Sequence, residues 1–147
     1  MENRQPSADM IIDGFFADAL SGQGSTARGR TGRVRDHLRR FVEEMGESVM
    51  VESDRRMVEA ERQFSPDSAV ERIARADDLV FLLPLFIAVD RLLPHRLDAR
   101  AQLLLSRGLL HWMAGLYNPE ICCPLHEFEA EYARSSQHLK TELARER

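Results

Sequence analysis

Apolar residues recur every three or four positions through most of the chain, which is the period of an amphipathic helix. After Ser7, a good N-cap, one such stripe predicts a helix that ends near the two glycines of "SGQGS" (residues 21–25). A second stripe predicts a helix that ends at Gly46, and its members are Val34, Leu38, Phe41, Val42 and Met45. Residues 47–64 carry many charges and predict a short, exposed helix.

Prolines are expected to divide the rest of the chain. Ser65 as N-cap and Pro66 at the first helical position predict that a helix starts there. Pro84 is expected to kink or split the next apolar segment, and Pro94 to end it. From Arg96 a long helix should follow, with an inner side made of Leu97, Ala101, Leu104, Leu105, Leu109, Trp112 and Met113. After a loop over residues 115–124, a last helix is expected over about 125–145.

No segment alternates with the two-residue period of a strand, and no internal repeat is visible. The sequence therefore predicts an all-α fold, a compact bundle of six or seven helices. Its 147 residues are enough for one domain with a real core, so a single helical domain over 1–147 is expected.

One stretch stands out by its charge. The chain has 20 basic and 24 acidic residues, and six of the basic ones lie in "STARGRTGRVRDHLRRF" (residues 25–41). Without these six, 14 basic residues remain against 24 acidic ones, so the positive charge is local. Uniform affinity for a polyanion is therefore not expected. The six candidates for phosphate contact are Arg28, Arg30, Arg33, Arg35, Arg39 and Arg40.

Two interpretations of this arginine cluster remain open. At 100° per residue, Arg33 and Arg40 point away from the apolar stripe, while Arg35 and Arg39 flank it. A helix docked through its stripe would present guanidinium groups to phosphates. Alternatively, the cluster is the solvated side of a helix, partly neutralised by pairs of Asp36 with Arg40 and of Arg39 with Glu43.

Catalytic and metal motifs are absent from the sequence. The adjacent Cys122 and Cys123 close no useful loop and indicate a reducing cytoplasm, and His126 stands at a poor spacing for a metal site. No glycine-rich phosphate loop, Ser-His-Asp order or acidic pair is legible. The longest apolar run, of 11 residues (79–89), is too short to cross a membrane. A cytoplasmic, non-enzymatic protein without metal or cofactor is predicted.

A resemblance to a known family adds to this picture. Gly24, Ser25 and Thr26 precede a basic helix that carries Thr31, Val34, Leu38 and Phe41, and "ADDL" (76–79) looks like the start of a third helix. The stretch "LLSRGLLHWMAGLYNPEI" predicts a helix that carries aromatic residues and is followed by Asn118 and Pro119. Over about residues 8–121 the chain resembles the N-terminal, SAM-like core-binding domain of tyrosine recombinases, a four-helix unit that clasps DNA. The last helix would be an addition to that unit.

The spacing of residues in "PHRLDARAQLLLSRGL" is similar to that of the same family's catalytic box, but Asp98 stands where that box requires an arginine. The His37 and Arg40 spacing alone carries no chemistry. The resemblance thus implies a non-catalytic module that contacts the DNA backbone through the six arginines. The alternative is a small all-α interaction protein, either a homodimer or a protein that binds its partner through the C-terminal helix, whose apolar stripe is Leu125, Phe128, Tyr132, Leu139 and Leu143.

Overall fold

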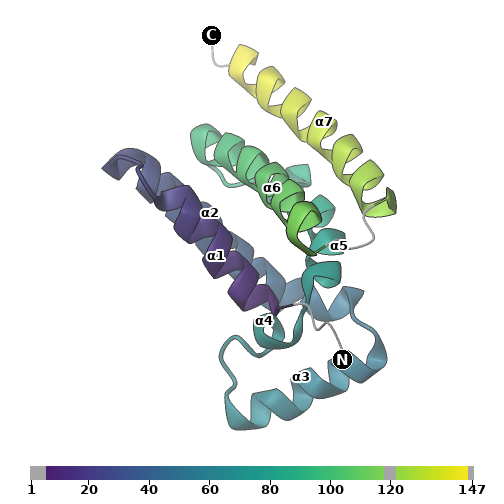
Figure 1. Ribbon diagram of the computed structural model, residues 1–147. Coiled ribbons are helices and arrows are strands. Elements are labelled where there is room, and N and C mark those ends of the chain that lie inside the picture. Colours follow the sequence, from purple (N-terminus) through teal and green to yellow (C-terminus); the bar gives the residue numbers. More distant parts are fainter. Residues whose placement is uncertain (1–5, 118–121, 146–147) are drawn as a thin grey trace.

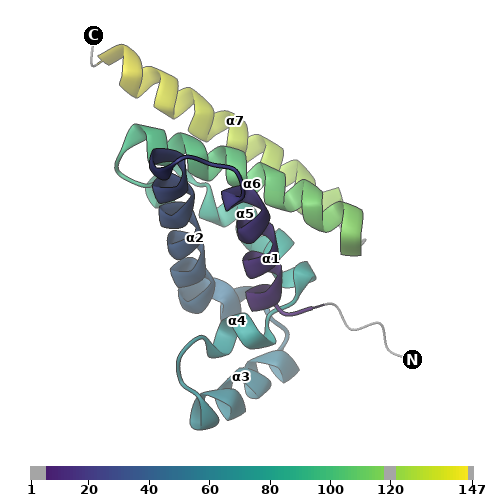
Figure 2. The ribbon, with the colours of Figure 1, turned by 60° about the vertical axis from the view of Figure 1, so that its left-hand side comes forward.

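The computed structural model describes residues 6–117 and 122–145, and this part of the chain forms seven α-helices (Figures 1 and 2). Two short 3-10 turns, η1 (Gly46–Val49) and η2 (Val89–Arg91), lie between helices. The α-helices are α1 (Ala8–Leu20), α2 (Ser25–Met45), α3 (Glu52–Phe64), α4 (Ala69–Ile73), α5 (Ala76–Phe86), α6 (Arg96–Tyr117) and α7 (Cys122–Arg145). The all-α prediction is confirmed.

The helices pack around one apolar core. α1 and α2 form a hairpin, α6 packs against α2, and α7 lies along α5 and α6 (Figures 1 and 2). The starts of α2 and α6 and the last turns of α7 lie at one end of the molecule, and α3 lies at the other. Val34, Leu38, Phe41 and Val42 are buried, so the predicted stripe is the side of α2 that meets the core.

The start of α1 follows its sequence signal. Ser7 Oγ accepts a hydrogen bond from the backbone N–H of Met10 at 3.3 Å, as expected of an N-cap. The two acidic residues that open α5 were also expected, and Asp78 Oδ2 accepts the backbone N–H of Arg75 at 2.9 Å. Burial raises the pKa of this Asp78 carboxyl.

The predicted helix start at Ser65 is wrong. Ser65 is the C-cap of α3, and α4 begins only at Ala69, after Ser68 in a left-handed conformation with φ 61°. Long-range contacts decide this boundary. Arg72 donates to the carbonyls of Ser65 and Asp67, both at 2.6 Å. Glu43 of α2 accepts the N–H groups of Val70 and Glu71, at 3.4 and 2.9 Å, and so caps α4 from outside.

Two helix boundaries near prolines differ from expectation. α5 is not split at Pro84 but runs through it and ends two residues later, at Phe86. α7 begins at Cys122, earlier than the expected Leu125, with Pro124 in its first turn, where a missing N–H is harmless. Residues 118–121, the centre of the expected loop, lie outside the described part.

The inner side of α6 also differs from its prediction. The residues that are buried include Asp98, Ala99, Gln102, Leu103 and Ser106, whereas Leu97 and Leu104 are about half exposed. Gln102 takes a core position because its side-chain amide forms hydrogen bonds with three backbone groups. Its Nε2 donates to the carbonyls of Phe86 and Arg91, at 2.9 and 3.1 Å, and its Oε1 accepts the N–H of Leu93 at 2.8 Å.

Candidate nucleic-acid interface

The six arginines of α2 do not form one continuous surface. The helix turns Arg28, Arg35 and Arg39 towards its α1 side, and Arg30, Arg33 and Arg40 towards its α6 side. One contact on each side agrees with this arrangement. Arg28 Nη1 donates to the carbonyl of Leu20 at the end of α1, whereas Arg33 bonds Asp98 of α6. The cluster is therefore two rows on opposite flanks of the helix.

Arg39 is withdrawn into an ion-pair network. Its Nη1 lies 2.9 Å from Asp9 Oδ1 and 2.6 Å from Glu71 Oε2, and its Nη2 bonds Asp13. The Arg39 side chain is 25% exposed and that of Glu71 only 2%. Burial raises the pKa of Glu71, although Arg39 opposes the shift. Three carboxylates surround Arg39, so it connects α2 to α1 and α4. Its positive charge is neutralised by these partners and is not available to a phosphate.

The expected pairs along α2 are replaced by others. Glu43, the expected partner of Arg39, caps α4 instead. Asp36, the expected partner of Arg40, lies 3.2 Å from Arg35 Nε. Arg40 is exposed and has no ion pair within the described residues.

On the α6 flank, one carboxylate holds two arginines. Arg33 binds Asp98 with two parallel hydrogen bonds, Nε to Oδ2 and Nη2 to Oδ1, both at 3.0 Å. Arg30 Nε lies 3.8 Å from the same Oδ1. The hydrogen bonds from Arg33 lower the pKa of the Asp98 carboxyl. This bidentate pair uses Nε and Nη2 of Arg33, so the Nη1 amino group takes no part in it. The Arg33 side chain is 57% exposed.

Between the two rows, the first half of α2 has a face without large side chains, and Asp36, whose side chain is 59% exposed, follows on the same face one turn after Gly32. Gly29 and Gly32 lie on this face in the first half of the helix. A Cβ atom added at Gly29 would come 3.3 Å from Arg33 Nη1, and one added at Gly32 would come 3.7 Å from Arg35 Nη2. The guanidinium groups of Arg33 and Arg35 thus reach this glycine face from opposite flanks.

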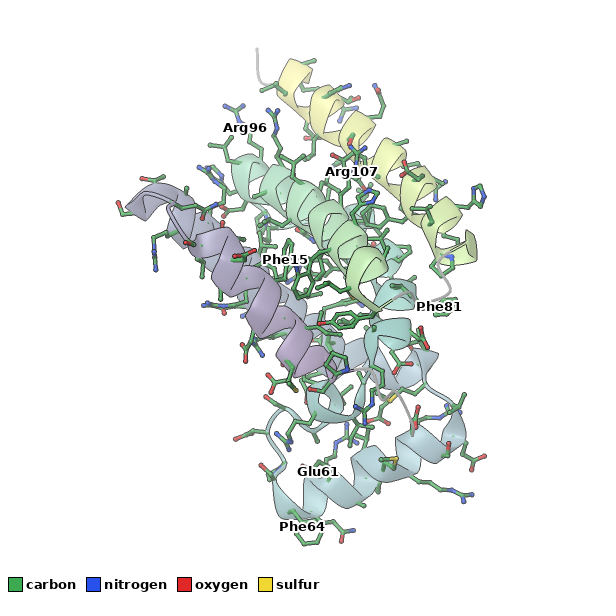
Figure 3. The ribbon with its side chains drawn as sticks, viewed as in Figure 1. Phe15, Glu61, Phe64, Phe81, Arg96 and Arg107 are labelled. Carbon is green, nitrogen blue, oxygen red and sulfur yellow. The ribbon has the colours of Figure 1, made fainter. Side chains whose placement is uncertain are left out.

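A second group of cations was not singled out from the sequence. Arg96 at the start of α6 (Figure 3), Arg100 one turn later and Lys140 of α7 line a groove of about 470 Å³. The i, i+4 spacing of the two arginines beside Leu97 and Leu104 was the available signal. It was missed because both leucines were assigned to the core.

The candidate metal ligands of the described part of the chain do not come together. Residues 6–117 and 122–145 contain no group of three or more His, Cys, Asp or Glu side chains that could hold a metal ion. His37 Nε2 lies 2.7 Å from the carbonyl of Arg91, and its ring packs against Phe86. The side chains of Cys122 and Cys123 lie outside the described part, so the expectation of two free thiols stays a prediction.

Comparison of the chain with protein-family models, curated proteins and solved structures finds no match. Among the helices that the structure describes, none combines the length and the apolar character that a membrane crossing requires.

Proposed function

We propose that this protein is a non-catalytic helical module that binds the phosphate backbone of duplex DNA through the first half of α2. The glycine face carries the proposal, because phosphates can approach a helix backbone closely only where side chains are short. Arg28, Arg30, Arg33 and Arg35 are the four contacts we assign. Phosphate contacts position a protein without reading sequence, so binding is expected to be independent of sequence.

Two of the six arginines have different roles in this proposal. Arg39 is a positioning residue, because its ion pairs with α1 and α4 hold α2 in place. Arg40 lies on the α6 flank beyond the glycine face, and we assign it no phosphate contact. The resemblance to the core-binding domain of tyrosine recombinases points to the same basic helix. A cytoplasmic location fits the adjacent cysteines and is part of the proposal.

The test is binding of a fluorescent DNA duplex, measured by anisotropy over a range of salt concentrations. Four engaged arginines predict a log-log slope of affinity against salt of about −3.6. The double variant Arg28→Gln with Arg35→Gln should lower that slope to about −1.8. The matched control is Arg55→Gln with Arg56→Gln, two exposed arginines of α3 at the opposite end of the molecule.

The control variant removes the same two charges and should keep the wild-type slope. Equal losses in the two double variants would mean that only net charge matters, and the glycine face would have no special role. Absence of binding by the wild type at about 20 mM salt, where phosphate contacts are strongest, would reject the proposal.

The alternative is a protein partner bound through the C-terminal helix, and one exposed residue of that helix, Leu143, favours it. Phe128 is buried, and Leu125, Tyr132 and Leu139 pack against the core, so most of the α7 stripe is used within the chain. Leu143 in the last turns remains 37% exposed beside the groove with α6. An interaction protein would use that groove.

A further inference from the structure

The groove between α6 and α7 is apolar inside. It lies between the first half of α6 and the second half of α7, and its apolar lining consists of Leu97, Leu103, Leu104, Tyr132, Leu139 and Leu143. Leu97 is 43% exposed and Leu104 52% exposed. The Tyr132 ring is covered by the Arg107 guanidinium, which lies 5.3 Å from the ring centre. Two leucines on one face of α6 are thus left in contact with water.

The rim of this groove is positively charged. Among the described residues, Arg96, Arg100 and Lys140 line it, and no carboxylate does. Within the described residues, Arg100 and Lys140 have no ion pair, in contrast to Arg33, Arg39 and Arg72. An apolar floor with a cationic rim fits an amphipathic helix with acidic surroundings.

The opposite end of the molecule presents such a helix. In α3, Val58 faces the core and is fully buried, whereas Met57 and Phe64 share the outer side and are 47% and 89% exposed. Ala60, between them on the same side, is exposed too. The surroundings are acidic, because residues 43–78 contain 11 acidic and five basic residues, and eight acidic residues remain without Glu43, Glu71 and Asp78, which bind groups inside the chain. Glu59 of α3 is 75% exposed.

The two surfaces match in length as well as in charge. Met57 to Phe64 and Leu97 to Leu104 each span seven residues, about 10 Å of helix. Figure 3 shows Phe64 and Arg96 at opposite ends of the molecule, so α3 cannot reach the groove of its own chain. The two surfaces can meet only between copies.

We propose that α3 of a second copy docks into the groove between α6 and α7, with Phe64 as its apolar anchor. The contact is head-to-tail, because two grooves placed face to face would bring Arg96, Arg100 and Lys140 of both copies together. A head-to-tail contact leaves one free surface at each end and therefore propagates into dimers, trimers and longer chains. One helix in one groove is a small interface, so the association is weak and reversible. It does not depend on the proposed DNA binding.

The experiment is sedimentation velocity of the full chain, without nucleic acid, from about 10 μM to about 1 mM, the range of a weak interface. The wild type should form a concentration-dependent series of oligomers that dissociates at high salt. Phe64→Ser and Leu104→Ser should each weaken association at least about tenfold. The matched controls, Val51→Ser and Leu116→Ser, change exposed apolar residues of the α3 and α6 regions outside the two surfaces and should behave as the wild type.

Mixing the two variants gives the sharpest result. Phe64→Ser keeps an intact groove and Leu104→Ser keeps an intact α3, so the mixture should form one-to-one dimers and nothing larger. Circular dichroism checks that both variants are folded. A wild type that stays monomeric at about 1 mM overturns the proposal, since even a weak contact would populate dimers there. A mixture that stays monomeric also overturns the proposal and would indicate a symmetric dimer or a different partner. An equal loss of association in the control variants overturns it as well.

Discussion

Arg39 and Arg40 are neighbours in sequence with opposite predicted effects on stability. Replacing Arg39 by Gln removes the cation from a site shared by Asp9, Asp13 and Glu71, the last of which is 2% exposed. Removing one partner of a buried pair costs roughly 3–5 kcal/mol. Because Arg39 is 25% exposed and two of its partners reach water, we expect a loss of about 3 kcal/mol. Arg40→Gln touches no ion pair among the residues that the structure describes and should change stability by less than about 0.5 kcal/mol.

Urea unfolding at pH 7, followed by circular dichroism, measures both variants. For a chain of this length, about 3 kcal/mol corresponds to a fall in Tm of roughly 6–12 °C. The deficit of Arg39→Gln should shrink as the pH is lowered from about 7 to about 5, since the folded pKa of Glu71 is already raised by burial and rises further without the arginine. The folded state then binds more protons than the unfolded state, and stability falls as the pH rises through that window.

The comparison also separates structure from binding. Both variants remove one positive charge from α2, so a difference in stability reflects the ion pairs and not the net charge. Losses for Arg39→Gln and Arg40→Gln that agree within about 0.5 kcal/mol, or a deficit that does not depend on pH, would contradict the network.

Three further predictions concern packing. Leu38→Ala, at a site 1% exposed, should cost about 2–5 kcal/mol in urea unfolding, and Leu104→Ala less than about 1 kcal/mol; equal losses would place Leu104 in the core after all. Gly46→Ala would press its Cβ against Val70 Cγ1 and should cost about 1–3 kcal/mol, most of it recovered when Val70→Ala is added; additive losses would exclude that clash. Gln102→Leu leaves the Phe86 carbonyl and the Leu93 amide without their partner, while His37 Nε2 still lies 2.7 Å from the Arg91 carbonyl, and should cost about 3 kcal/mol; an unchanged hydrogen-exchange rate of the Leu93 amide would argue against this.

The sequence by itself determined the helical class and the course of its clearest helices. Ser7, the glycines near residue 22, and the stripe from Val34 to Met45 are local signals, because N-caps, turns and the 3.6-residue period act between close neighbours in the chain. It also located the arginines and the apolar residues of α7. These inferences need no knowledge of what packs against what.

Tertiary structure decided how those residues are used. Glu43 and Arg72 move the start of α4 past a good N-cap signal at Ser65. The carboxylates that neutralise Arg39 come from α1 and α4, and the one that holds Arg33 comes from α6, 65 residues away. Leu97 and Leu104 fit a core pattern as well as Leu109 does, and they stay exposed because they line the open groove between α6 and α7. An ion pair or a buried face depends on two elements meeting in space, which periodicity within one element cannot specify.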